Sequence, residues 1–499
     1  MATLDPENTL ICFTNARLAT PEGALVTGDL WIDSHTGRIL DAQRTFFAGR
    51  RPERIIDLGG NVLCPGFVDV QINGAYGVDF SLYDDDERYL KGLERVATRI
   101  VETGVTALVP TIVTQSAELY PTLLRLLRPH TYPTGAHLLG WHAEGPFLQP
   151  SKRGAHTPAL LRAAPDGWDS IEAVYGAANL AEQEDWLMQN ADGGAGVGVR
   201  VVTGAPELEG VGASVGELAR RGVVFSLGHS IAPTVTASRA IAAGARLITH
   251  LFNAMPQLHH RDPCIIGLLG SSPSLAGTFA ASSSSANPAL GLGSEALDAE
   301  PTPAPTPAHT APPSPPSGAR GREKVVGVER PWYGLIVDGV HSHPNSVRVR
   351  PFSSHHPNGE KEILTQTQLA YGAHPAGCIL VTDAMSVLDP HLPDGVHAWR
   401  DGVNFVKAGA RLYLEGTDTL AGSVVTMDTC VRNFVKFTGC TLGEAVRCAT
   451  FNPAQCLGIA DRKGTLRPGA DADLVVLDDA GRVLSTWVAG REVWTRPTV

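Results

Sequence analysis

The chain has 499 residues, of which 43% are hydrophobic and 18% charged, a composition typical of a globular protein with a large core. Its 51 acidic and 40 basic residues give a net charge of -11 at pH 7, which offers no overall attraction to nucleic acid or to an anionic membrane. The acidic N-terminal segment and the absence of a run of about 18 apolar residues argue against a secretory leader and a membrane span. None of the eight cysteines forms a CxxC pair, so we expect reduced, mostly buried thiols in a cytoplasmic protein.

The two ends of the chain share a β-rich pattern. Short β-like pieces separated by turns fill residues 8–60, for example Leu30 to Asp33. Similar pieces return near the C-terminus, from Ala472 to Leu477 and from Val483 to Val493. We therefore predict one small β-sandwich domain built from both chain ends, to which residues 1–60 and 463–499 contribute.

Between these ends lie eight continuous apolar runs rich in β-branched residues. They occupy residues 62–70, 105–113, 136–143, 197–203, 223–227, 246–249, 332–337 and 378–382. Continuous rather than alternating apolar runs are expected of parallel strands that are buried on both faces. Helix-like stretches such as 86–102 and 211–221 separate most of them. Residues 61–462 are therefore predicted to form an α/β domain, a (β/α)8 TIM-like barrel.

A low-complexity segment at about residues 281–322 interrupts this pattern. It includes a proline-rich stretch from Glu300 to Gly318 and follows a run of serine and alanine. Such a composition cannot bury enough apolar surface to offset the entropy of ordering. Because it falls between the sixth and seventh runs, we expect an insertion within the barrel rather than a domain boundary. A polar stretch from Ser353 to Glu362 indicates a smaller loop insertion.

Metal-ligating and acidic residues follow several of the predicted strands. Glu144 follows the third run, His229 the fifth, His250 the sixth and Asp383 the eighth. Reactive residues of such barrels lie where the strands end, so these side chains are expected to converge. Two imidazoles and one carboxylate form a plausible metal site that leaves a position open for water. Asp383 would face this site as a general base.

Several motifs lie at or near these strand ends, namely Pro65 to Asp69 with Gln71, Asn73 and Gly74, His142 to Phe147, Lys152 to His156, Gly228 to Ser230, Thr249 to Pro256, Asp338 to His341, Val381 to Ala384, and Leu420 to Ser423. Together they resemble the motifs of the N-acetylglucosamine-6-phosphate deacetylases, a family of the amidohydrolase superfamily. The late segment Gly464 to Leu474 resembles the return strand of the superfamily's β-sandwich. The resemblance covers about residues 60–478, without the insertion.

This resemblance implies a reaction and a set of residue roles. It implies hydrolysis of N-acetylglucosamine 6-phosphate to glucosamine 6-phosphate and acetate, in amino sugar catabolism, by a homodimer. The metal ligands would be Glu144, His229 and His250, and the catalytic acid/base Asp383. The substrate site would be lined by Ala155, His156, Asn253, Ala254, Arg261, His341, Leu420, Ala421 and Gly422. Among these, Arg261 and His341 would lie near the phosphate, and His156 beside the amide carbonyl.

The sequence also bears on the number of metal ions. Many amidohydrolases carry His-x-His after strand one and a bridging lysine after strand four. Here those places read Gln71-Ile72-Asn73 and Val202-Thr203-Gly204. We therefore expect one divalent ion per subunit. Zinc is the first candidate, and iron, cobalt and manganese also suit the donors.

Two other functions remain open at this point. The first is another amidohydrolase, such as a cyclic amidase that opens dihydroorotate or a hydantoin. The second is a non-catalytic scaffold that kept the barrel and lost the chemistry. The missing His-x-His and lysine argue against the binuclear cyclic amidases, and the intact set of Glu144, His229, His250 and Asp383 argues against a scaffold.

Overall fold

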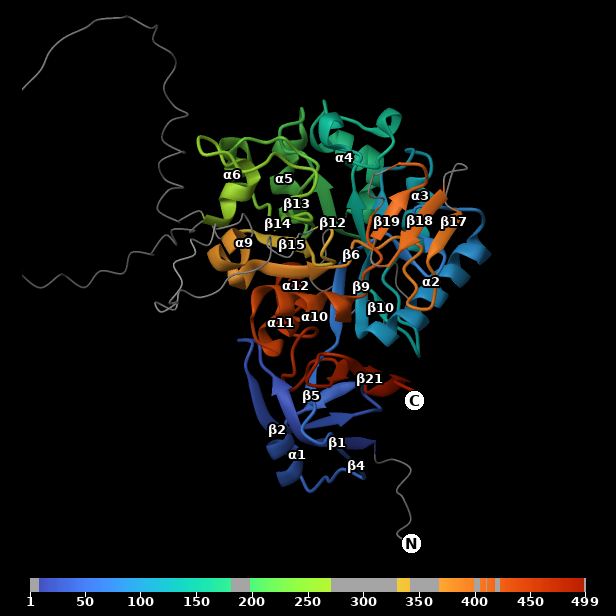
Figure 1. Ribbon diagram of the computed structural model, residues 1–499, viewed down its shortest axis with the longest axis vertical. Helices are drawn as coiled ribbons and strands as arrows, with labels where there is room; N and C mark the ends of the chain where they lie inside the picture. The colour runs from blue at the N-terminus through green and yellow to red at the C-terminus, as the bar shows by residue number, and fades with distance from the viewer. Residues whose placement is uncertain are drawn as a thin grey trace, which may run out of the picture. The chain divides into compact units, whose positions relative to one another are not determined.

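A computed structural model describes residues 9–180, 198–270, 330–341, 368–398, 404–409, 411–417 and 422–497 (Figure 1). The predicted insertion at about 281–322 and the polar stretch 353–362 lie outside these residues. Among the helices of the described ranges, none is long and apolar enough to cross a membrane.

Eight parallel strands form the barrel that the sequence predicted. In their order around the barrel they are β6 (Phe67–Ile72), β9 (Val105–Val113), β11 (Trp141–Glu144), β12 (Val199–Gly204), β13 (Val224–Leu227), β14 (Leu247–Ile248), β15 (Trp332–Ile336) and β16 (Cys378–Val381). The first and last strands meet at their carboxyl ends, where the Asp383 amide donates to the Gln71 carbonyl oxygen at 2.9 Å. The same contact brings residues from opposite ends of the barrel sequence side by side.

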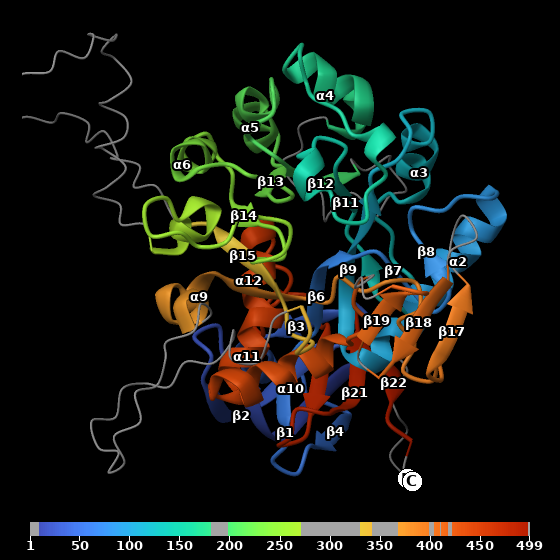
Figure 2. The same cartoon turned by 45° about the horizontal axis from the view of Figure 1, so that its top comes forward.

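Helices lie outside these strands, as expected of a (β/α)8 barrel (Figure 2). They are α2 (Asp86–Ile100), α3 (Tyr120–Leu126), α4 (Trp168–Tyr175), α5 (Val211–Arg220), α6 (Thr234–Ala242), α9 (Gln368–Ala373), α10 (Met427–Thr438), α11 (Leu442–Ala449) and α12 (Phe451–Leu457). Asp85 is the N-cap of helix α2, and its side chain accepts a hydrogen bond from the Arg88 amide at 2.8 Å. Its buried residues recur at helical spacing, namely Tyr89, Leu93, Val96 and Ile100.

Two of the predicted runs were wrong in extent, because glycines divide them. The run 62–70 contains β5 (Val62–Pro65), which pairs with strands of the terminal sheet, and β6, which begins the barrel. Between them a Cβ on Gly66 would lie only 1.9 Å from Thr106 Oγ1, so the close backbone approach requires glycine. The run 136–143 is divided into β10 (His137–Leu138) and β11 by Gly140, which has a φ of +104°.

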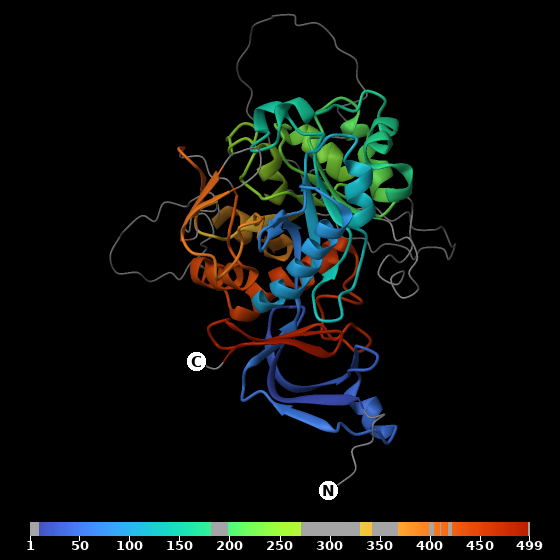
Figure 3. The ribbon, with the colours of Figure 1, turned by 90° about the vertical axis from the view of Figure 1, so that its right-hand side faces the viewer.

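Strands from both chain ends pair in one eight-stranded sheet (Figure 3). Its order is β22 (Arg491–Thr495), β21 (Val483–Val488), β20 (Leu474–Leu477), β5, β1 (Leu10–Ala19), β2 (Leu25–Asp33) and β3 (Arg38–Leu40), with β4 (Arg54–Asp57) paired to β1 and the short helix α1 (Ala42–Phe47) following β3. The antiparallel β5–β20 pair joins the two ends. The domain boundaries at residues 60 and 463 stay a prediction.

A buried ion cluster precedes the C-terminal strands. The Lys463 ammonium, whose side chain is 3% exposed, lies 2.8 Å from Asp471 Oδ2 and 2.5 Å from Asp473 Oδ2. Burial opposes the charge on Lys463, but the two carboxylates outweigh it and raise the Lys463 pKa. The Asp473 backbone oxygen also accepts from the Gly66 amide at 2.8 Å, so this cluster is tied to the start of the barrel.

A small antiparallel sheet and a hairpin complete the described structure. The sheet contains β17 (Gly395–Ala398), β18 (Asn404–Ala408) and β19 (Arg411–Leu414), and the hairpin β7 (Gly74–Ala75) and β8 (Val78–Asp79). The hairpin directly follows the carboxyl end of β6, and the sheet follows that of β16. Both therefore belong to segments that leave the barrel at the carboxyl ends of its strands, and the candidate site residues lie at the same ends.

Candidate active site

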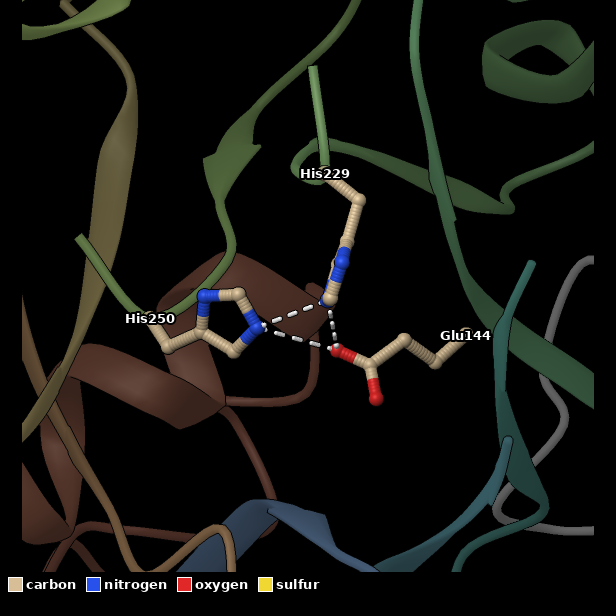
Figure 4. A group of neighbouring side chains, drawn as sticks. All are labelled: Glu144, His229 and His250. Carbon is tan, nitrogen blue, oxygen red and sulfur yellow. Dashed lines mark hydrogen bonds and ion pairs between the residues drawn. The ribbon is translucent and has the colours of Figure 1, made fainter. Parts of the chain in front are cut away.

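Three predicted metal ligands converge at the carboxyl ends of β11, β13 and β14. Figure 4 shows Glu144, His229 and His250 pointing toward one another from separate segments. Glu144 Oε1 lies 3.3 Å from His229 Nε2 and 3.2 Å from His250 Nε2, and the two Nε2 atoms are 3.0 Å apart. All three side chains are at least 94% buried. The prediction that these three strand ends meet is confirmed.

The backbone at these positions is held in an uncommon conformation. His229, His250 and Asp383 have φ values of 48°, 25° and 46°, in the left-handed region that residues other than glycine seldom adopt. Each comes within two residues of the end of a barrel strand. The chain therefore turns sharply there, and the side chain is directed across the barrel mouth. Such strain tends to gather at functional sites.

The donor set fits a divalent metal ion. The ring atom His229 Nδ1 lies 2.7 Å from the Lys152 carbonyl oxygen, which can only accept, so Nδ1 carries the proton. The His229 Nε2 lone pair then faces the cluster, an arrangement typical of metal-bound histidine. A tetrahedral shell with metal–ligand distances of about 2.0 Å places its ligand atoms about 3.3 Å apart, close to the separations found here.

The charges within the cluster are strongly coupled. Burial alone would raise the pKa of Glu144, but the nearby imidazoles of His229 and His250, 3.3 and 3.2 Å from its Oε1, hold it well below its usual value. Burial alone would lower the pKa of His250, but the Glu144 carboxylate has the larger effect and raises that pKa. The carboxylate is therefore ionised at neutral pH and able to act as a ligand.

Asp383 lies beside this cluster and is held by two neutral amides. Asn73 Nδ2 donates to Asp383 Oδ1 at 2.8 Å, and Gln71 Nε2 donates to the same oxygen at 3.2 Å. Gln71 Nε2 also donates to Glu144 Oε1 at 3.1 Å. Burial, followed by the charge of Glu144, raises the pKa of Asp383 to about 6. A carboxylate with a pKa in this range suits a general base at neutral pH.

A chain of hydrogen bonds lies within the barrel, and three of its members, His142, Ser226 and Thr249, come one to three residues before the predicted ligands. The Val70 carbonyl oxygen accepts from His142 Nδ1 at 3.1 Å, so His142 Nε2 accepts from the Thr203 hydroxyl at 2.7 Å. That hydroxyl in turn lies 2.7 Å from Thr249 Oγ1, which is 2.5 Å from Ser226 Oγ. Burial lowers the pKa of His142 to about 4, so its ring is neutral at pH 7. The chain ties together the strands that carry Glu144, His229 and His250.

His156 is a predicted substrate residue whose ring lies beside the metal cluster. Its ring centroid is 4.7 Å from that of His229, and its Nε2 lies 3.8 Å from Glu144 Oε2. The Thr114 amide donates to His156 Nδ1 at 3.2 Å, so the neutral ring carries its proton on Nε2. That N–H group is therefore on the side of the ring nearer the cluster.

The other predicted substrate residues are less closely grouped. Asn253 Nδ2 donates to the His250 carbonyl oxygen at 3.2 Å, and the Ala254 carbonyl oxygen accepts from the Ser230 amide at 3.2 Å. His341 Nδ1 lies 2.6 Å from Asp338 Oδ2. Ala155 and Arg261 are exposed. Within the described ranges, no hydrogen bond or ion pair joins Arg261 to Glu144, His229 or His250.

At the late loop, Gly422 adopts a φ of 108°, and a Cβ there would meet the Met385 side chain at 2.5 Å. Leu420 and Ala421 lie outside the described residues. From the sequence, Gln71 and Asn73 were noted only as residues that stand where other amidohydrolases have histidine ligands. The chain of hydrogen-bonded hydroxyl groups was not predicted. The position of the two amides at the end of the first barrel strand was the available signal.

A parallel barrel that gathers this donor set and an aspartate at its carboxyl-terminal face has the architecture of a metal-dependent hydrolase. The Amidohydrolase family model matches residues 62–493. N-acetylglucosamine-6-phosphate deacetylases of Bos taurus and Danio rerio are 38% and 37% identical, over 97% and 94% of this chain and 96% and 93% of their own lengths. The chain therefore belongs to the amidohydrolase family, and its relatives place it among the N-acetylglucosamine-6-phosphate deacetylases.

Solved structures agree with this assignment. The N-acetylglucosamine-6-phosphate deacetylase of Thermotoga maritima is 25% identical with a TM-score of 0.66, over 97% of this chain and 100% of that one. A mutant of the Mycobacterium smegmatis deacetylase, solved in complex with N-acetyl-D-glucosamine-6-phosphate, is 26% identical with a TM-score of 0.66, over 98% of this chain and 100% of that one. The predicted barrel fold is confirmed.

Proposed function

We propose that the protein hydrolyses the N-acetyl amide of N-acetyl-D-glucosamine 6-phosphate to D-glucosamine 6-phosphate and acetate, in amino sugar catabolism. The observation that carries this proposal is the convergence of Glu144, His229 and His250 with Asp383 beside them. A long match to deacetylases of this substrate supports the choice of amide. The complete donor set argues against a non-catalytic scaffold.

In the proposed reaction, Glu144, His229 and His250 hold one divalent ion. That ion, when bound, supplies Lewis-acid activation of water and of the amide carbonyl. Asp383 accepts a proton from the attacking water as its oxygen bonds to the carbonyl carbon, and passes a proton to the amide nitrogen as the C–N bond breaks. The amine and acetate are the products. The His156 Nε2–H group lies near the cluster and is suited to donate to the carbonyl oxygen.

The remaining substrate contacts follow from the chemistry of a sugar phosphate. Asp338 holds His341 through Nδ1, which leaves His341 Nε2 as the ring atom suited to meet the phosphate. Arg261 offers a planar guanidinium suited to phosphate oxygens. We assign Ala155, Asn253, Ala254 and the segment Leu420 to Gly422 to the walls around the sugar.

Three further properties belong to the same proposal. Zinc suits two imidazoles and a carboxylate, so we propose one zinc ion per subunit. The eight cysteines are free thiols, six of them buried, which is consistent with a reducing, cytoplasmic location. The homodimer rests on the family resemblance.

A substrate panel tests the proposal. Acetate release from N-acetylglucosamine 6-phosphate is compared with that from unphosphorylated N-acetylglucosamine, and with ring opening of dihydroorotate. We expect turnover of the phosphorylated sugar to be fastest. Ring opening without acetate release would favour a cyclic amidase, and no turnover by metal-loaded protein would favour a scaffold.

A further inference from the structure

We infer that Gln71 is a positioning residue, whose side-chain amide holds a metal-ligating carboxylate and the general base in fixed relation to each other. Gln71 lies at the carboxyl end of β6 and is 2% exposed. Its Nε2 donates to Glu144 Oε1 at 3.1 Å and to Asp383 Oδ1 at 3.2 Å. This inference rests on the proposed function, because it assigns Glu144 and Asp383 the roles given above.

The chemistry of the amide group suits this task. An amide nitrogen carries two hydrogens, so it can give one to each carboxylate, and both acceptors fix the orientation of the amide. Glu144 and Asp383 are buried acids whose negative charges repel each other. A histidine or lysine at position 71 would add a titrating group or a further ligand, whereas glutamine adds a donor without changing the charge. Donors to ionised groups also form the stronger class of hydrogen bonds.

The backbone of Gln71 adds to the same link. Its carbonyl oxygen accepts from the Asp383 amide at 2.9 Å, so main chain and side chain both hold Asp383. Asn73 provides a natural comparison, because its side chain donates to Asp383 at 2.8 Å and makes no described contact with Glu144. The geometry thus assigns two different tasks: Gln71 supports the metal ligand and the base, and Asn73 supports the base alone.

The first test measures metal affinity without turnover. Metal-free Gln71→Leu, Asn73→Leu and Gln455→Leu are titrated with Zn²⁺ against a competing chelator, after circular dichroism confirms folding. Gln455 is a half-buried glutamine on α12, outside the site, and serves as the matched control. Loss of a group that orients a ligand typically lowers metal affinity by about 10–100-fold. We expect this loss for Gln71→Leu only. Affinity within about threefold of wild type would overturn the link to Glu144.

The second test is a double-mutant cycle at saturating metal, with kcat and KM for N-acetylglucosamine 6-phosphate as readouts. Gln71→Leu should lower kcat by roughly 10–100-fold with little change in KM. In an Asp383→Asn background the same change should cost less than about threefold, because asparagine cannot act as the general base that Gln71 positions. Equal losses in both backgrounds would show a purely structural role and overturn the inference.

A second variant and a wild-type control distinguish failure of this inference from misfolding and from failure of the proposed function. If Gln71→Leu does not fold, Gln71→Met retains the length of the side chain without a donor and carries both tests. If wild-type protein binds Zn²⁺ but releases no acetate, the proposed function fails. The metal titration then still decides whether Gln71 supports Glu144.

Discussion

Replacement of Asp383 by asparagine separates the catalytic role of this residue from its structural one. Asparagine keeps the size of the side chain, and its Oδ1 can still accept from Asn73 Nδ2 and Gln71 Nε2. It cannot take a proton from water. General acid–base catalysis contributes typically 10²–10⁴-fold, so we expect kcat to fall by about that factor, which corresponds to roughly 3–5 kcal/mol. KM and metal content should change little.

The same substitution should stabilise the metal-free protein. The pKa of Asp383 is raised from 3.8 to about 6, so ionisation of this buried group opposes folding. Well below pH 3.8 the carboxyl is protonated in both states and has no such effect. The cost grows as pH rises from 3.8 to about 6, levels off above that, and is roughly 3 kcal/mol at pH 7. Asparagine removes this cost, so Asp383→Asn should resist urea better than wild type at pH 7, and the difference should shrink as pH falls from about 6 to 3.8 and vanish below that.

Turnover and urea unfolding of the two proteins, measured side by side, check both expectations. Activity within about threefold of wild type would remove Asp383 from the mechanism. A variant that is less stable than wild type at pH 7 would show that the carboxylate is a net stabilising group, and that the environment inferred here for Asp383 is wrong.

Three further outcomes are expected. Elemental analysis of active protein should give close to one metal ion per chain, because Gln71 and Asn73 are weak ligands, and two tightly held ions would contradict this. Arg261→Ala should lower kcat/KM for the phosphorylated sugar by roughly tenfold to a hundredfold while barely changing turnover of N-acetylglucosamine, and equal losses would make Arg261 structural. Lys463→Met should lower the free energy of unfolding in urea by about 3–5 kcal/mol, because it removes the cation that pairs with the buried Asp473 carboxylate, whereas Asp471 keeps Arg38 and Arg462. A loss below about 1 kcal/mol would refute that cluster's role.

The barrel and the convergence of Glu144, His229 and His250 could be predicted because they depend on local patterns. A continuous apolar run predicts a buried parallel strand, and the residue that follows it lies at the barrel mouth, as Glu144, His229 and His250 do. The division at Gly66 could not be predicted in this way. It depends on the approach of Thr106 from another strand, which no local pattern records.

The hydrogen-bonding partners of the ligands were not predictable either. Gln71 and Asn73 looked like absent ligands, because sequence reasoning sorts residues by whether they can bind metal. Their role depends on where the Asp383 and Glu144 oxygens lie in space. The chain from His142 to Ser226 is hidden for the same reason, since buried serine and threonine in strands usually pass for ordinary core residues.

Acetate release from N-acetylglucosamine 6-phosphate, before and after removal of metal, tests the central claim most directly. The protein as purified should release acetate and glucosamine 6-phosphate in equal amounts. Chelation should abolish the reaction, and one equivalent of a divalent ion per chain should restore it. Full activity in metal-free protein, or no acetate from protein that holds its ion at Glu144, His229 and His250, would contradict the claim.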